Sequence, residues 1–398
     1  MKLLFFIALL MPTIAHARPE YAVREKLTCI NCHVNPMGGG HRKIFGKVFG
    51  SRGKGLALST SSDLYYGDMR SIFVRREGDN SEGVNGLSIM TAAGSLNIPV
   101  IEAGEHNKLN TNVVVSHDFG KLSSGTKNTY LLFSDPELEG FFTTAMFGKF
   151  PPPFGLFTDE HRTYTKLQTM TTWNRDFSMG GVISGDPFEV THYDLAVTNG
   201  FRNTTFNTDD ETYAVIGNLR WNPNSLPFLL GASWISEYTR MKSQGRSPYG
   251  WSLYSAIDLH SITDKVVPLS ILGEIVDARF YNTDRNSNIS AKFIDVTANQ
   301  AYRDAVNNQF SRGYYLQLKY EILPTLQLNY KYDLLLLSRS YKDDGYFRHG
   351  IGARYQFGSN LSLTARVERA RAKRPGLNQT GTLWADTDGF FAFLRFWL

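Results

Sequence analysis

The sequence predicts an all-β protein: a transmembrane antiparallel β-barrel of about 16 strands, preceded by a short N-terminal segment of a different kind. Three observations predict it. Apolar and polar residues alternate along most of the chain, short and long connections alternate between these segments, and no apolar run of eighteen residues follows residue 17. The last observation excludes a helical membrane span. The slightly negative mean hydropathy is compatible with a barrel, because barrel strands average apolar and polar residues.

The alternation is clearest near the C-terminus. Between residues 312 and 322 the even positions are apolar or aromatic and the odd positions are mostly polar. The same period of two recurs in three further segments: 326–336, 347–357 and 361–368. A period of two indicates strands with one apolar face. A soluble β-sandwich alternates in the same way, so the connections have to distinguish the two folds.

The connections favour the barrel. Short turns are expected at 185–187, 222–226, 261–265, 323–325 and 358–360, and longer polar loops at 200–211, 239–248, 282–311, 339–345 and 372–385. Outer-membrane barrels have tight periplasmic turns and longer external loops. Aromatic residues also close the apolar face of single strands at both ends, as two interfacial girdles would: Tyr213 with Trp221, and Phe347 with Phe357.

The strand count is even, as a single-chain bacterial barrel requires. Eleven strands are expected between Ser178 and Leu398, and five more at 63–76, 86–96, 109–120, 128–135 and 140–150. A barrel of this size encloses an aqueous lumen. The long loop 151–177 after the fifth strand either folds inward as a constriction or lies on the surface.

The first seventeen residues resemble a secretory signal peptide. Lys2 precedes the apolar stretch Leu3 to Met11, and Ala15-His16-Ala17 is a small-x-small cleavage site. The alternative is a short buried helix. We therefore expect a signal peptide over 1–17, a mature chain that starts near Arg18, and a location in the outer membrane of a Gram-negative cell.

Both cysteines of the chain lie in Cys29-Ile30-Asn31-Cys32-His33, which has the spacing of a c-type haem attachment site. Two thiols at this spacing form thioethers with the haem vinyl groups, and the adjacent histidine becomes the proximal iron ligand. Two alternatives are a redox-active dithiol, which lacks the βαβ surroundings of thioredoxins, and a zinc site completed by His33 and His41. The sequence thus predicts one covalent haem c in a segment over 18–62, with the barrel over 63–398.

The sixth iron ligand has several candidates. Met37 follows His33 too closely to reach the opposite haem face, whereas His41 has twice the reach and follows the flexible Gly38-Gly39-Gly40. His192 and His260 are reserve candidates, because the strand register points both into the lumen near periplasmic turns. The alternatives are a five-coordinate iron and, for these histidines, an ordinary exposed or lumen position.

The last strand presents aromatic residues on both faces. Phe390, Ala392, Leu394, Phe396 and Leu398 form the lipid-facing set, and Phe391, Phe393, Arg395 and Trp397 face inward. An aromatic inward face suits a lumen in which something apolar packs, such as the haem segment. The alternative is a local error in the assumed register.

The formal net charge of +5 is concentrated in the N-terminal segment. Residues 18–54 hold eight basic and two acidic residues, a local sum of +6. The candidate partners of these charges are the haem propionates, an acidic periplasmic cytochrome, and inward carboxylates such as Asp194, Asp258 and Glu321. A merely solvated basic stretch is the alternative. Nucleic-acid binding is not expected, because the protein is exported and the basic segment carries the haem motif.

With these features the sequence resembles the fused cytochrome-porins of the outer membrane, found in bacteria that oxidise ferrous iron. The resemblance rests on the haem motif with its flanks, Pro19 to Arg24 and Phe45 to Phe49, and on the barrel architecture; the spacer Met37 to His41 is longer and richer in glycine than the family pattern. It implies electron transfer between an extracellular donor or acceptor, with Fe(II) favoured, and a periplasmic cytochrome c. An Fe(II) oxidase activity would follow from that.

Two other functions remain open. The first is an outer-membrane diffusion porin whose haem segment is a plug or sensor. The second is a haem enzyme such as a peroxidase, for which the sequence offers no identifiable distal acid–base pair. The chain has no phosphate-binding loop, dinucleotide fingerprint, HExxH motif or nucleophile elbow.

Overall fold

The computed structural model of the chain describes residues 22–24, 27, 29–38, 41–43, 45–46, 63–78, 81–104, 108–120, 125–135, 137, 140–158, 163–169, 171, 177–188, 190–199, 212–223, 226–239, 249–261, 267–279, 310–336, 345–357, 360–372 and 387–397. The expected signal peptide over 1–17 lies outside the described residues. No helix in the described part of the chain combines the length and the apolar character that a bilayer span needs.

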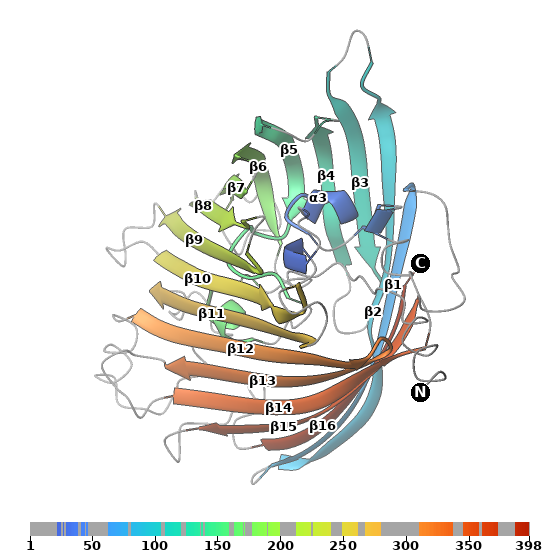
Figure 1. Cartoon of the computed structure of the whole chain (residues 1–398), viewed down its shortest axis with the longest axis vertical. Coiled ribbons are helices and arrows are strands. Elements are labelled where there is room, and N and C mark those ends of the chain that lie inside the picture. The colour runs from blue at the N-terminus through green and yellow to red at the C-terminus, as the bar shows by residue number, and fades with distance from the viewer. Residues whose placement is uncertain are drawn as a thin grey trace, which may run out of the picture.

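Within these residues, sixteen antiparallel strands form one closed barrel, and each strand pairs with its neighbours in sequence (Figure 1). The predicted fold class and strand number are therefore confirmed. The strands are β1 (Tyr65–Gly78), β2 (Ser81–Ile101), β3 (Asn110–Asp118), β4 (Gly125–Ser134), β5 (Gly140–Phe150), β6 (Ser178–Phe188), β7 (Thr191–Thr198), β8 (Thr212–Trp221), β9 (Phe228–Thr239), β10 (Tyr249–Asp258), β11 (Leu269–Arg279), β12 (Phe310–Leu323), β13 (Leu326–Leu336), β14 (Gly345–Gln356), β15 (Leu361–Ala372) and β16 (Thr387–Trp397).

The barrel closes where β1 pairs with β16, with Asp68 opposite Trp397. Closure removes the sheet edges, so every strand has two hydrogen-bonded neighbours. Successive side chains then face the lumen and the outside in turn, which is the alternation seen in the sequence. Ile351, for example, is 68% exposed on the outer face, whereas Phe391 of β16 is 1% exposed and faces inward.

The expected girdle residues also face outward. Tyr213 and Trp221, at the two ends of β8, are 47% and 39% exposed. An outer face lined by exposed apolar and aromatic side chains suits contact with lipid, because a soluble protein rarely exposes so large an apolar surface.

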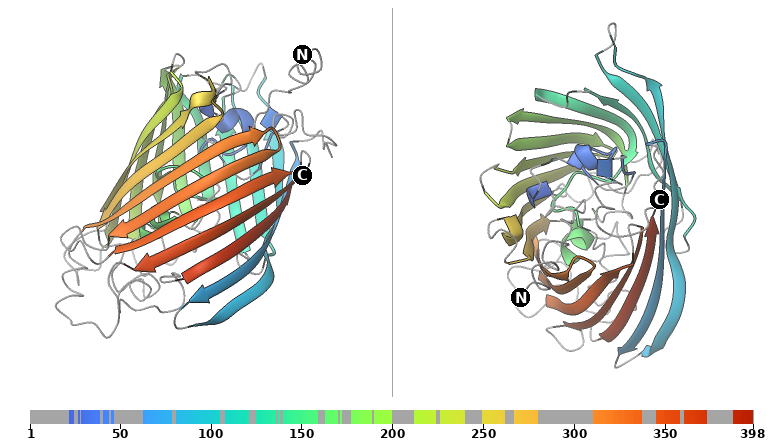
Figure 2. Two further views of the ribbon diagram at one scale, coloured as in Figure 1. Left: turned by 60° about the horizontal axis from the view of Figure 1, so that its bottom comes forward. Right: turned by 45° about the vertical axis from the view of Figure 1, so that its right-hand side comes forward.

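The N-terminal segment lies in the barrel at one end. Its short helix α3 (Cys29–Cys32) is in the lumen at the end where the 3₁₀ helix η2 (Leu259–Ser261) connects β10 and β11 (Figure 2). The turns at this end are short, such as the one that joins β12 and β13 between Leu323 and Leu326. We call it the short-turn end.

The loop after β5 folds into the lumen, which decides between the two alternatives left open by the sequence. Phe154 and Leu156 are 1% and 2% exposed, and the helix α5 (Tyr164–Thr169) packs inside the barrel against β11, β12 and β13. We call the described residues of this stretch, 151–158, 163–169 and 171, the inward loop.

The N-terminal segment and the inward loop share two buried apolar clusters with the barrel wall. Val34 and Met37 belong to the same cluster as Phe154, and Val23 belongs to the same cluster as Leu156. The inside of the barrel is thus partly filled by two chain segments, each held by apolar contacts.

Candidate functional site

The haem motif folds as one helical turn. The backbone N–H of His33 donates to the carbonyl of Cys29 over 2.9 Å, so the turn of α3 continues up to the histidine. Residues three apart in a helix lie on the same face, which places the two cysteine side chains side by side. Cys32 and His33 are buried. The two cysteines form no disulfide.

Two glycines pack tightly against this turn. Gly38 has a φ of +94°, and a Cβ added there would lie 3.3 Å from Cys29 Sγ. A Cβ at Gly46 would lie 2.2 Å from the carbonyl oxygen of Cys32. Only glycine therefore allows the chain to come this close to both ends of α3. This gives a physical role to one glycine of the Gly38-Gly39-Gly40 run, and to Gly46 in the flank after the motif.

A short antiparallel bridge joins His33 to Arg42. The N–H of Val34 donates to the carbonyl of His41, and the N–H of Lys43 donates to the carbonyl of Cys32, both over 3.0 Å. In such a pairing the directly opposite residues share a face and their neighbours point the other way. His33 and Arg42 therefore share one face of the hairpin, and His41 lies on the other face with Val34.

His41 is held at the barrel wall. Its Nδ1 is 3.1 Å from Ser95 Oγ of β2, and its ring lies 5.8 Å from that of Tyr66 of β1. His41 is 3% exposed. The hairpin register thus turns this first-choice sixth ligand away from His33, and its Nδ1 contact ties it to β2.

Strand parity placed one reserve candidate correctly and does not apply to the other. His192 does face inward on β7, but its Nδ1 lies 2.8 Å from Asp186 and its Nε2 lies 3.0 Å from Asp194, so both ring nitrogens already contact carboxylates. His260 lies in η2, because β10 ends two residues earlier, at Asp258. The strand register used to point His260 into the lumen therefore does not apply to it.

Charged and aromatic contacts fix the N-terminal segment to the wall at the short-turn end. Arg24 Nε donates to Asp258 of β10 over 2.6 Å, and its guanidinium lies 3.5 Å from Glu321 of β12. Arg42 lies over the ring of Trp397 of β16, 5.5 Å from its centroid. Asp258 and Glu321 are thus confirmed as partners of the basic segment. Of the inward aromatic face of the last strand, Trp397 contacts this segment, whereas Phe391 packs with Ile72 of β1 and Met90 of β2.

The third predicted carboxylate, Asp194, has a different partner. It accepts from Arg220 Nη2 of β8 over 3.2 Å, and Arg220 Nη1 in turn donates to Cys29 Sγ over 3.1 Å. Asp194 therefore reaches the N-terminal segment through a basic residue of the barrel. Arg220 is the clearest residue of this candidate site that sequence reasoning missed; its inward parity, between the outward Leu219 and Trp221, was the available signal.

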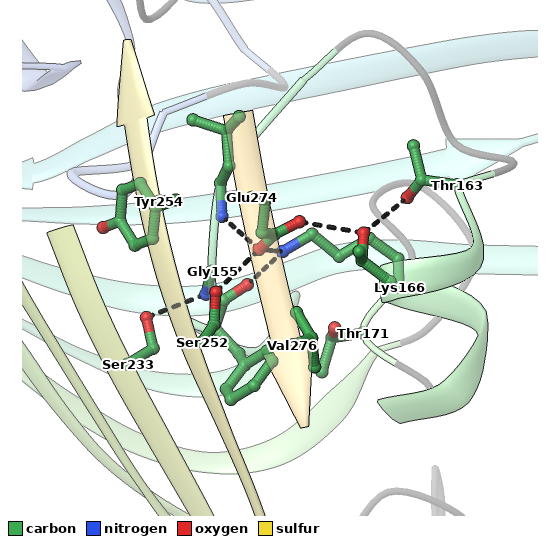
Figure 3. A network of polar contacts seen from close by, with 12 residues as sticks. Gly155, Thr163, Lys166, Thr171, Ser233, Ser252, Tyr254, Glu274 and Val276 are labelled. Carbon is green, nitrogen blue, oxygen red and sulfur yellow. Dashed lines mark hydrogen bonds and ion pairs between the residues drawn. The ribbon is translucent and has the colours of Figure 1, made fainter. Parts of the chain in front are cut away.

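A second polar network holds the inward loop. Glu274 of β11 accepts from Lys166 Nζ over 2.9 Å, from Thr165 Oγ1 over 2.9 Å and from the backbone N–H of Leu156 over 2.8 Å. Figure 3 shows Glu274 between Ser252 of the wall and Lys166 of α5. One buried carboxylate therefore anchors both halves of the loop.

Burial also affects two lysines of the inner segments. It lowers the pKa of Lys166, although the Glu274 carboxylate favours the charged form. It likewise lowers the pKa of Lys43, next to the haem motif, where Asp63 acts in the opposite direction. Both segments thus hold cationic groups in poorly hydrated positions.

The donor set at α3 fits a c-type haem. Such a group needs two thiols on one turn and a histidine directly after the second, and the backbone geometry provides that arrangement. Among the residues that the structure describes, no group of three or more His, Cys, Asp or Glu side chains is arranged to hold a metal ion.

The barrel is similar in fold to solved structures of porins and outer-membrane channels. An anion-selective porin from Comamonas acidovorans aligns with a TM-score of 0.57 at 11% identity, over 84% of this chain and 98% of that one. The outer-membrane channel DcaP of Acinetobacter baumannii gives 0.56 at 11% identity, over 84% and 96%. OmpF of Salmonella typhi, in complex with daunomycin, gives 0.56 at 9% identity, over 84% and 97%.

No protein-family model matches the sequence, and no curated protein is significantly similar to it. The described residues form a closed sixteen-stranded antiparallel barrel with the fold of the solved outer-membrane porins. The N-terminal segment, with the haem motif, enters this barrel at the short-turn end.

Proposed function

We propose that the chain is an outer-membrane barrel that carries one covalent haem c in its lumen and passes electrons between an extracellular donor or acceptor and periplasmic carriers. The observation that supports it most is the placement of the Cys29–His33 turn inside the barrel, fixed to β8 through Arg220 and tied to the hairpin at Arg42. A porin that only passed solutes would have no use for two thiols and a histidine held in this way.

Cys29 and Cys32 would hold the haem through thioethers. Each forms when the S–H group adds across a vinyl double bond, sulfur bonding to one carbon and hydrogen to the other, so no oxidant is needed. His33 would be the proximal ligand. The bound group supplies one-electron redox chemistry, and the protein controls its burial and hydrogen bonding, which tune the potential.

The barrel gives this redox centre a place in the membrane. A hydrocarbon layer of about 30 Å separates the two aqueous sides, and a barrel wall can hold the haem within that depth. The short-turn end faces the periplasm in barrels of this kind, so a haem there is close to a periplasmic cytochrome c. The resemblance to the fused cytochrome-porins favours Fe(II) as the external donor.

The sixth iron position can be tested at His41. Because the hairpin register turns His41 away from His33, we expect His41→Ala to leave the haem spectrum unchanged. A low-spin to high-spin change in that variant would instead make His41 the distal ligand.

A diffusion channel with a plug is the second candidate function. The fold comparison favours it, because the matched solved structures include a channel and an anion-selective porin. In that case the N-terminal segment would regulate solute passage, and the haem would be a sensor or a structural clamp.

The experiment compares the full-length wild type with Cys32→Ala, both in proteoliposomes. Haem staining of a denaturing gel tests covalent attachment, and stopped-flow mixing with ferrous iron, or with ferric chelates after reduction, tests electron transfer and its direction. For the wild type we expect one haem per chain and electron transfer to an acceptor, or from a donor, enclosed in the liposomes. In Cys32→Ala we expect the haem and the electron transfer to be lost while the barrel stays folded. An unstained wild type would overturn the proposal. Solute swelling rates that are high and equal in both proteins would favour the channel.

A further inference from the structure

The contact between Arg220 and the Cys29–His33 turn is unusual for a partly buried guanidinium. The Arg220 side chain is 14% exposed and lies at the short-turn end of β8. One of its N–H groups donates a hydrogen bond to the thiol sulfur of Cys29. Sulfur is a weak acceptor, whereas arginine normally pairs with carboxylates. Arg220 therefore places a full positive charge directly beside the first cysteine of the motif.

Asp194 fixes the position of that charge. Its carboxylate is fully buried and accepts from Arg220, from Ser184 Oγ over 2.7 Å and from Asn218 Nδ2 over 2.9 Å, and it contacts His192. All of these residues lie in neighbouring strands β6, β7 and β8. Because the strands are rigid elements, the Arg220 guanidinium is held in place by the barrel and not by the segment that it contacts.

The contact is compatible with a covalently attached haem. Thioether formation replaces the S–H bond of Cys29 by an S–C bond, and the sulfur keeps lone pairs that accept from Arg220. The pair Arg220 and Asp194 would then lie beside the attached edge of the haem, with the cation nearer to the sulfur and the anion behind it.

We propose that Arg220 and Asp194 are positioning residues for the haem: Arg220 docks Cys29 against β8, and the two charges shift the reduction potential in opposite directions. This inference rests on the proposed function. Reduction removes one positive charge from the iron, so a nearby cation favours the reduced state and a nearby anion favours the oxidised state. The barrel wall, and not only the haem segment, thus sets the potential.

The test is a spectroelectrochemical titration of the full-length, haem-loaded protein in detergent. Arg220→Gln should lower the midpoint potential, Asp194→Asn should raise it, and Arg220→Lys, which keeps the charge, should stay near the wild type. The control is Arg312→Gln, which breaks a pair with Asp277 of 2.6 Å at the opposite end of β11 and β12 and should shift nothing.

The opposite signs separate this proposal from a purely structural role. A variant that only loosens the segment would admit water to the haem, so both substitutions would move the potential in one direction. Equal signs, or no shift in either variant, would overturn the proposal while leaving the haem-carrying barrel intact. A wild type without covalent haem would overturn the proposed function and this inference together.

Arg220→Gln should still fold, because Asp194 keeps its contacts with Ser184, Asn218 and His192. The heat-dependent mobility of the barrel in a detergent gel checks this for each variant. If Arg220→Gln does not fold, the midpoint potentials of Asp194→Asn and Arg220→Lys still test the proposal. A midpoint potential of Asp194→Asn that is no higher than that of Arg220→Lys would contradict it.

Discussion

The buried ion pair between Arg24 and Asp258 should hold the N-terminal segment in the barrel. The side chains are only 8% and 0% exposed, and the Nε to Oδ2 distance is 2.6 Å. Removal of one partner of a buried pair costs about 3–5 kcal/mol, because the other charge stays buried without compensation. Asp258 would keep the backbone N–H of His260 at 3.2 Å, so we take the lower end, about 3 kcal/mol.

Because about 1.4 kcal/mol corresponds to a factor of ten, Arg24→Gln should raise the undocked fraction of the segment roughly 100-fold. The assay is trypsin cleavage after Arg42 or Lys43 in the detergent-solubilised barrel, followed by mass spectrometry. The carbonyl of His41 and the N–H of Lys43 form backbone hydrogen bonds on either side of Arg42, which holds this stretch in the hairpin, so cleavage requires the segment to open. When opening is fast relative to cleavage, the rate follows the open population.

The matched control is Arg369→Gln, which removes the same charge from an exposed pair with Asp388, 64% and 44% exposed. Exposed pairs are screened by solvent and contribute little to stability, so cleavage should change little. The double variant Arg24→Gln/Asp258→Asn should be cleaved more slowly than Arg24→Gln, because it also removes the buried negative charge that has lost its Arg24 partner. Cleavage of Arg24→Gln within threefold of the wild type, or equal acceleration by the control, would refute the reasoning.

Three further outcomes are expected. Gly38→Ala should reduce haem content more than Gly125→Ala. Both glycines have a positive φ, but only a Cβ at Gly38 would contact a neighbouring side chain, the Cys29 thiol at 3.3 Å. Equal haem content of the two variants in a pyridine-haemochrome assay would contradict this. Glu274→Gln should lower the free energy of thermal unfolding by about 3 kcal/mol, because Lys166 stays buried without its carboxylate partner. Adding Lys166→Met should recover part of that loss. A double variant no more stable than Glu274→Gln would count against the argument. Leu253→Arg, at an outward position that is 52% exposed, should cost about 2–4 kcal/mol of unfolding free energy in liposomes, and an unchanged value would show that this face is not in contact with lipid.

The strand pattern and the Cys29–His33 motif were predictable because both are local, whereas the helical turn that the motif forms is a finding of the structure. The positions of β6 to β16 follow from a period of two, and the i, i+3 spacing of Cys29 and Cys32 fixes their common face once a turn of helix forms. Strand parity also selected Asp258 and Glu321 as inward carboxylates, and both contact Arg24.

Parity was less informative for the histidines. It placed His192 correctly on the lumen face, but the neighbouring Asp186 and Asp194, which contact its two nitrogens, determine what it can bind. For His260 the assumed strand continued past its real end at Asp258. A period of two indicates which way a side chain points, but it does not show where a strand stops or what the side chain meets.

The sequence by itself determined a barrel of about sixteen strands and the Cys-x-x-Cys-His spacing of the N-terminal motif, because alternation, turn spacing and motif spacing act over a few residues. Only the tertiary structure decided that the loop after β5 folds inward, that His41 lies at β2, and that Arg220 contacts Cys29. These depend on contacts between residues that are far apart in sequence, 191 positions in the case of Cys29 and Arg220 and 234 for Arg24 and Asp258. Such contacts form only when the barrel closes, since closure brings strands from both ends of the chain to one lumen.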